Sequence, residues 1–137
     1  MTLILCLDDK NGMAFNGRRQ SRDAQLRARI LMQVGQRKLW MSQYSAKQFE
    51  LLPEQVIVDD DFMNKAEAGD ACFAELNDPS DNLSRCSKII IYRWNRVYPA
   101  DLVFPLAKYA DRMKLLRKED FVGSSHEHIT EEIYEIV

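Results

Sequence analysis

The amino-acid sequence predicts an α/β fold in one domain over residues 1–137, with a mixed, mostly parallel sheet, flanking helices and an antiparallel C-terminal strand. Strand and helix patterns alternate over residues 1–58, which is typical of a parallel sheet covered by helices. The β-branched and aromatic run KIIIYRW (88–94) indicates a strong further strand. The alternating segment EEIYEIV (131–137) indicates an antiparallel strand that is partly exposed.

The first two elements are a strand and a helix. Residues 3–7 are continuously apolar, which suits a strand covered on both faces. Turn-forming residues follow at 9–12. Ser21 is a suitable N-cap for the helix, and Asp23 then lies in its first turn, where the helix dipole favours a carboxylate. Apolar residues recur every four positions and predict the buried face of the helix, which ends at Gly35. They are Leu26, Ile30 and Val34.

The next elements complete the alternating pattern. Residues 38–41 (KLWM) predict a second strand, and Ser42 or Ser45 is the expected N-cap of a short helix that runs to Leu52. Residues 55–58 (QVIV) predict a third strand.

Composition excludes several classes of protein. The net charge of -2 and pI near 5.7 provide no bulk attraction to nucleic acid or to an anionic membrane. Three cysteines without CxxC spacing argue against a disulfide framework or a zinc ribbon. The opening apolar run is too short for a signal peptide. We therefore expect a cytoplasmic protein.

Two clusters suggest metal chemistry. Asp8, Asp9 and residues 59–61 follow predicted strands, and carboxylates at strand ends suit Mg²⁺ and phosphoryl chemistry. The alternative is that these are solvated turns. His126 and His128 form an HxH pattern that would need acids from elsewhere to hold a metal. We assign no metal ligands from these patterns, and metal binding by the two histidines stays open.

One basic cluster is the preferred ligand contact. Arg18, Arg19 and Arg22 lie close together, with Arg27 and Arg29 nearby. Together with backbone amides at the helix start, they suit a phosphate or carboxylate. The alternative is a solvated charged face.

Several stretches resemble the dihydrofolate reductase family. Residues 88–105 (KIIIYRWNRVYPADLVFP) are similar to its late strand and Gly-Asp-x-x-Phe-Pro-like turn, and residues 3–17 look like its first strand and flexible loop. Residues 121–136 are similar to its closing hairpin, and residues 38–45 to a strand-to-helix turn. The shared order covers most of the chain and implies a dihydrofolate reductase-like fold.

The resemblance also implies site residues. The loop containing Asn16 and Gly17 would be a lid over a ligand, and Asp23 would take the place of the catalytic acid that assists protonation of the substrate ring. Ser45 and Tyr92 stand where the family has threonines that contact phosphate and pterin. NADPH is the cofactor that the resemblance implies.

Departures from the family pattern affect the same site. Residues 19–21 read Arg-Gln-Ser in place of Leu-Pro-Trp, and Gln43 replaces a phosphate-binding arginine. Only residues 68–70 (Ala-Gly-Asp) remain where a glycine pair is expected, and residues 54–55 offer no arginine for a folate tail. Dihydrofolate reduction is therefore not expected.

Three functions follow from the sequence. The first is a divergent NADPH-linked reductase or a binder of a nucleotide or pteridine-like ligand, with degenerate cofactor and folate sites. The second is a non-catalytic binding or regulatory module on the same fold. The third is Mg²⁺-dependent phosphoryl chemistry at the strand-end aspartates.

Overall fold

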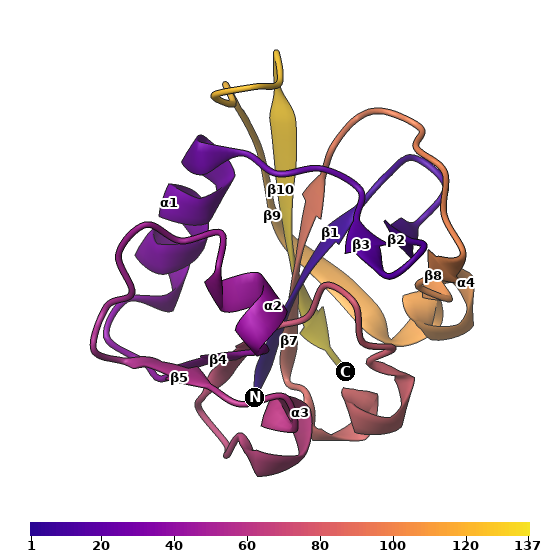
Figure 1. The fold of residues 1–137 in the computed structure, drawn as a ribbon. Coiled ribbons are helices and arrows are strands. Elements are labelled where there is room, and N and C mark those ends of the chain that lie inside the picture. Colours follow the sequence, from indigo (N-terminus) through magenta and orange to yellow (C-terminus); the bar gives the residue numbers. More distant parts are fainter.

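A seven-stranded mixed sheet forms the centre of the molecule (Figure 1). The structure is a computed structural model that describes residues 1–137. The strand order is β5-β4-β6-β1-β7-β10-β9. These strands are β1 (Thr2–Leu7), β4 (Leu39–Met41), β5 (Val56–Val58), β6 (Ala71–Phe73), β7 (Lys88–Arg93), β9 (Met113–Phe121) and β10 (Ile129–Ile136).

The pairing confirms the predicted fold class. β1 lies between β6 and β7 and is parallel to both, and β4 is parallel to β5 and β6. β10 is antiparallel to both β7 and β9. The sheet is therefore mostly parallel, with an antiparallel C-terminal hairpin.

Two hydrophobic clusters cover the two faces of the sheet. The period-two alternation of β1 sends Leu3, Leu5 and Leu7 into one cluster and Ile4 into the other. The helix α1 (Ala24–Val34) packs on the Ile4 side. Its predicted buried residues are those observed: Leu26, Ile30 and Val34.

The other elements are short and flank the sheet. They are α2 (Gln43–Ala46), α3 (Phe62–Lys65), α4 (Leu106–Tyr109), and the 3-10 helices η1 (Ser80–Arg85) and η2 (Ala110–Arg112). A second, three-stranded sheet has the order β3-β2-β8, formed by β2 (Gly12–Phe15), β3 (Arg18–Arg19) and β8 (Leu102–Val103).

The loop after β1 contains a β-hairpin. β2 and β3 form an antiparallel hairpin whose two turn residues, Asn16 (φ 53°) and Gly17 (φ 70°), have left-handed backbone angles. Gly12 has no positive φ. A Cβ there would lie 2.5 Å from Gln20 Nε2 and 2.7 Å from Ala100 Cβ. Close packing is therefore the reason for glycine at residue 12.

Some predicted boundaries were wrong. The N-cap of α1 is Asp23 and not Ser21, because the Asp23 carboxylate accepts from two backbone N–H groups of the first turn. Ser42 caps α2, which ends at Ala46 and does not continue to Leu52. The last strand is antiparallel and partly exposed, as predicted, and β9 lies beyond it at the edge of the sheet.

All three cysteines are unpaired, and Cys72 and Cys86 are buried. No helix combines the length and apolar character needed to cross a membrane.

Candidate functional site

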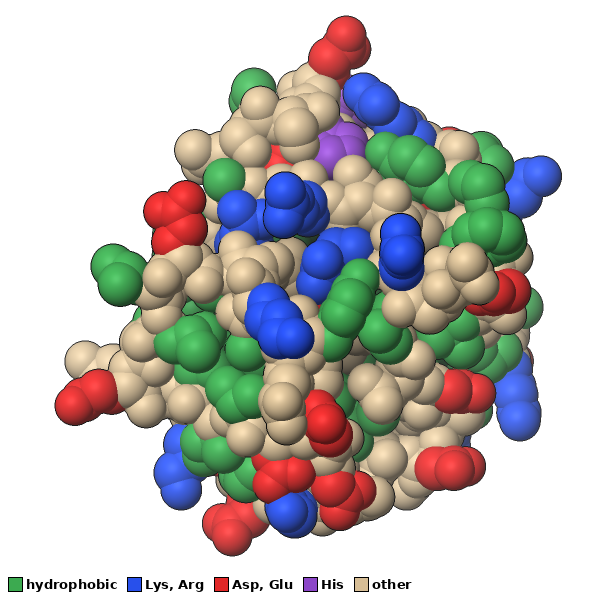
Figure 2. All heavy atoms as spheres, in the orientation of Figure 1, with side chains coloured by type: hydrophobic (Ala, Val, Ile, Leu, Met, Phe, Trp, Pro, Cys, Tyr) green, Lys and Arg blue, Asp and Glu red, His purple; other side chains and the backbone are tan.

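The candidate site lies where the parallel strands of the central sheet end. Ligands of open α/β sheets bind beyond the carboxyl ends of the strands. Glu75 follows β6 at this end, and β10 begins here because it runs antiparallel to β7. In Figure 2, basic side chains gather around a hollow between α1 and the β2–β3 hairpin. The predicted basic cluster therefore lies on the face that the fold makes available to a ligand.

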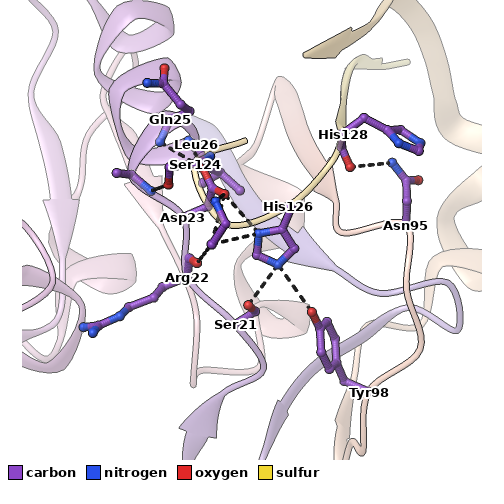
Figure 3. A network of polar contacts seen from close by, with 12 residues as sticks. Ser21, Arg22, Asp23, Gln25, Leu26, Asn95, Tyr98, Ser124, His126 and His128 are labelled. Carbon is purple, nitrogen blue, oxygen red and sulfur yellow. Dashed lines mark hydrogen bonds and ion pairs between the residues drawn. The ribbon is translucent and has the colours of Figure 1, made fainter. Parts of the chain in front are cut away.

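Asp23 joins the start of α1 to the loop between β9 and β10 (Figure 3). Its Oδ1 accepts from the backbone N–H groups of Gln25 (2.9 Å), Leu26 (3.2 Å) and Ser124 (3.0 Å). Its Oδ2 accepts from the Ser125 N–H (2.9 Å) and hydroxyl (3.2 Å), and lies 3.0 Å from His126 Nδ1. The Asp23 side chain has no exposed surface. Both oxygens are thus occupied by groups of the protein itself.

These contacts keep Asp23 ionised. Burial raises the pKa of its carboxyl group, but the N–H groups of Ser125 and Ser124 and the His126 side chain together hold that pKa well below its usual range. A carboxylate of this kind accepts hydrogen bonds and is a poor proton donor. The prediction that Asp23 assists catalysis stays a prediction, and its surroundings do not favour contact with a substrate ring.

His126 is held on three sides. Its Nδ1 faces Asp23, and its Nε2 lies 3.0 Å from Ser21 Oγ and 3.3 Å from the Tyr98 hydroxyl. The ring stacks on Trp94, with centroids 4.7 Å apart and 30° between the planes. Because ionised Asp23 only accepts, it favours the tautomer with a proton on Nδ1, which leaves Nε2 as an acceptor.

A second buried carboxylate, Glu75, lies at the carboxyl end of β6. Arg19 donates to it from Nε (3.0 Å) and Nη2 (3.2 Å). Ser45 Oγ and Gln48 Nε2 each donate to Glu75 Oε1 at 2.8 Å. Arg19 also lies over the Tyr44 ring, 4.2 Å from its centroid. Of the residues predicted to bind a ligand, Arg19 and Ser45 therefore bind Glu75.

A polar cavity of about 360 Å³ opens between the start of α1 and residues 47–50. Three cationic side chains line it: Arg22, Arg27 and Lys47. Arg27 Nη1 is buried and has no hydrogen-bond partner in the protein. An unpaired buried guanidinium nitrogen is costly, so this atom points to a missing acceptor.

The remaining predicted ligand residues have different positions. Arg22 lines the cavity, and Arg18 is exposed on β3. Asn16 and Gly17 form the exposed tip of the β2–β3 hairpin. Tyr92 is fully buried, and its hydroxyl donates to Glu131 Oε2 at 2.9 Å. Its position in the core does not support ligand contact.

The structure does not assemble the metal sites weighed from the sequence. No group of three or more His, Cys, Asp or Glu side chains is placed to hold a metal ion. Asp8 accepts from the N–H groups of Lys10, Gly12 and Tyr98, and Asp59 pairs with Lys65 at 2.6 Å. β4 and β6 separate the strands that these two aspartates follow.

Sequence reasoning missed two residues at this end of the sheet, Glu75 and Lys47. It noted His126 without its contact to Asp23, and it named Arg27 only as a neighbour of the basic cluster. Arg27 had a usable signal, because it follows Asp23 by four and so shares its face of α1. The contact of His126 with a residue 103 positions away had no local signal.

Comparison with known proteins identifies the fold. No protein-family model matches the chain, and no curated protein matches it. The chain is similar in structure to dihydrofolate reductase from Enterococcus faecalis, complexed with NADP(H) and RAB-propyl. The TM-score is 0.66 at 9% sequence identity, over 98% of this chain and 95% of that chain. The protein therefore has the dihydrofolate reductase fold, as its sequence predicts.

The residues present do not fit NADPH well. Gly69 lies before β6, at the amino end of the strand and away from the ligand end of the sheet. The residues after β6 are Ala74 and Glu75, and the buried Glu75 carboxylate accepts the Ser45 hydroxyl that was predicted to meet a phosphate. Because Glu75 already binds Arg19 and Ser45, these two donors are not free to hold the phosphates of an anionic cofactor.

Proposed function

We propose that this protein binds a small anionic molecule in the cavity between α1 and residues 47–50, and that it is not an NADPH-linked reductase of dihydrofolate. The observation that carries the proposal is Arg27, whose buried Nη1 has no hydrogen-bond partner in the protein and which lines this cavity together with two further cations, Arg22 and Lys47. A phosphate or carboxylate at this place would supply the acceptor that Arg27 lacks.

The lining of the cavity supports a polar, charged ligand. Of its ten lining residues, only Ala24 and Phe49 are hydrophobic. Gln48, Ser124 and Ser125 offer further polar groups. Nucleotides and pteridine-like acids, the ligand classes implied by the resemblance, both carry anionic groups. The fold thus serves as a binding module in this proposal.

The reductase alternative rests on the fold alone. The structurally similar enzyme is complexed with NADP(H), which makes NADPH a cofactor to include in any screen. Two observations argue against the reductase alternative. Glu75 is buried at this end of the sheet, and both oxygens of the Asp23 carboxylate already contact groups of the protein. A cytoplasmic location stays a prediction from the sequence.

Calorimetric titration tests the anion site. Nucleoside phosphates, pterin carboxylates and inorganic phosphate are titrated into the parent protein and into Arg27→Gln. A charge-assisted hydrogen bond contributes about 2 kcal/mol, so we expect Arg27→Gln to weaken binding of the best ligand roughly thirtyfold.

Arg117→Gln is the matched control, because Arg117 lies on the exposed strand β9 and does not line the cavity. It should leave the affinity unchanged. Equal affinities in the parent and Arg27→Gln, or no binding of any anion at millimolar concentration, would contradict the proposal.

A further inference from the structure

We propose that Ser21, His126 and Asp23 form a proton relay in which Ser21 acts as a nucleophile toward small carboxylic esters. The three side chains are connected in sequence: Asp23 Oδ2 lies 3.0 Å from His126 Nδ1, and His126 Nε2 lies 3.0 Å from Ser21 Oγ (Figure 3). Both distances are within the range required between a nucleophile, its base and the group that orients the base.

The relay is oriented before any substrate arrives. Asp23 is fixed by four backbone N–H groups and stays ionised, so it holds the Nδ1 proton of His126. Trp94 supports the ring by stacking. Nε2 is thereby directed at Ser21 as a proton acceptor. Asp23 is a positioning residue, because it acts through His126.

The chemistry of the relay balances without a cofactor. Ser21 Oγ attacks the carbonyl carbon of an ester, and its proton passes to His126 Nε2. The bond between the carbonyl carbon and the leaving oxygen breaks, and the proton on Nε2 passes to the departing alcohol. Water then attacks the acyl-serine, with Nε2 accepting a water proton and returning it to Ser21, and a carboxylic acid is released.

Donors for the developing oxyanion lie beside Ser21. The backbone N–H of Arg22, the next residue, makes no hydrogen bond within the protein. The Tyr98 hydroxyl lies 3.3 Å from the same Nε2 that faces Ser21. Because donors of this kind stabilise acyl-transfer transition states, both can serve a carbonyl oxygen at Ser21.

Access distinguishes this arrangement from a buried structural cluster. His126 and Asp23 are buried, whereas Ser21 retains exposed surface at the protein boundary. Arg22, next in the chain, lines the anion cavity, as do Ser124 and Ser125 of the same network. The esterase activity goes beyond the proposed anion binding and does not depend on it.

Covalent labelling tests the nucleophile directly. The folded protein is treated with a fluorophosphonate probe, and the modified peptide is located by mass spectrometry. We expect one adduct, on Ser21, that is absent in Ser21→Ala and strongly reduced in His126→Gln. Ser84, an exposed serine outside the network, is the control. Ser84→Ala should label like the parent.

Turnover gives the second measurement. We expect slow hydrolysis of p-nitrophenyl acetate that falls about a hundredfold in Ser21→Ala and is unchanged in His128→Gln, an exposed histidine two residues from His126. Thermal unfolding of each variant shows whether it is folded, and Ser21→Ala removes only one half-buried hydroxyl. No probe adduct on Ser21 in the folded parent, or equal hydrolysis by parent and Ser21→Ala, would overturn the proposal. Either result is separable from anion binding, which is tested with Arg27→Gln.

Discussion

At the scale of single residues, two carboxylates determine the chemistry of the ligand face. Asp23 connects the first turn of α1 to residues more than 100 positions later, and Glu75 connects Arg19 of β3 to Ser45 of α2. Each carboxylate is satisfied by several donors, which is the condition under which a buried charge is tolerated. The side chains at this face that do not bind either carboxylate include the cations at the cavity and Ser21, whose hydroxyl contacts His126.

Asp23→Asn should lower the free energy of unfolding of the protein and change how that free energy depends on pH. Because the folded-state pKa of Asp23 lies below the unfolded value of about 3.9, its contribution to the unfolding free energy is complete above about pH 4 and is lost as pH falls through the folded-state pKa. We expect Asn to lower the unfolding free energy at pH 7 by about 3 kcal/mol, because its amide cannot replace both carboxylate oxygens as acceptor.

Urea unfolding at a series of pH values measures both effects. The loss of stability in acid should be smaller in Asp23→Asn than in the parent. It should not vanish, because N–H groups of Tyr98, Gly12 and Lys10 outweigh burial and lower the pKa of Asp8 as well. Parallel pH curves for the two proteins would show that Asp23 is not an important acid-sensitive group.

At the scale of elements, the loop between β9 and β10 is closed tightly on the start of α1. Gly123 donates its N–H to the His126 carbonyl at 3.1 Å, and it lies against Asp23. A Cβ on Gly123 would lie 2.5 Å from Asp23 Oδ2 and 2.9 Å from the His126 carbonyl oxygen. Neither neighbour is the free end of a flexible side chain.

Gly123→Ala should therefore displace the loop from α1. We expect a loss of about 1–3 kcal/mol, typical of an extra methyl group in a packed site, measured as a lower melting temperature in calorimetry. Glu127→Ala, at an exposed position in the same loop, is the control and should melt like the parent. If Gly123→Ala melts at the parent temperature, the loop does not pack on Asp23 as described.

The periodic apolar patterns of β1 and α1 could be recognised in the sequence. The strands that are very short or mostly exposed could not. The apolar pattern of Leu3–Leu7 and the four-residue spacing in α1 depend on neighbours along the chain and were predicted correctly. β6 has only three residues, and β9 is mostly exposed, so neither carries an apolar signature of its own. Tertiary pairing decides such strands.

At the scale of the whole molecule, the fold was predictable because the order of motifs along the chain resembles that of dihydrofolate reductase, although the residues implied for its site differ. Residues 88–105 and 121–136 indicated the dihydrofolate reductase fold by their order and turn pattern, and that indication did not depend on the site residues. The partners of Asp23 and Glu75 come from distant segments, and only folding brings them together. The sequence could therefore single out Asp23 as a candidate site residue. It could not show that the Asp23 carboxylate contacts His126.

The residues that the resemblance implies for cofactor and folate binding are not present in this sequence. Glu75 places a buried carboxylate after β6, and no glycine pair follows that strand. Residues 54–55 are Glu and Gln, so the arginine expected for a folate tail is missing. Loss of that charge-assisted contact alone removes about 2–3 kcal/mol, or roughly a hundredfold in affinity.

We therefore expect NADPH to bind with a Kd above about 1 mM, equivalent to less than about 4 kcal/mol of binding free energy, and dihydrofolate not to be reduced. Fluorescence titration with NADPH measures the first expectation. NADPH oxidation in the presence of dihydrofolate, followed by absorbance beside an active dihydrofolate reductase, measures the second. Micromolar NADPH binding would show that the Glu75 carboxylate does not exclude the cofactor. Turnover of about 1 per second or faster would show that Asp23 still serves a substrate, although it contacts His126 and four N–H groups. The reductase alternative would then replace the binding module.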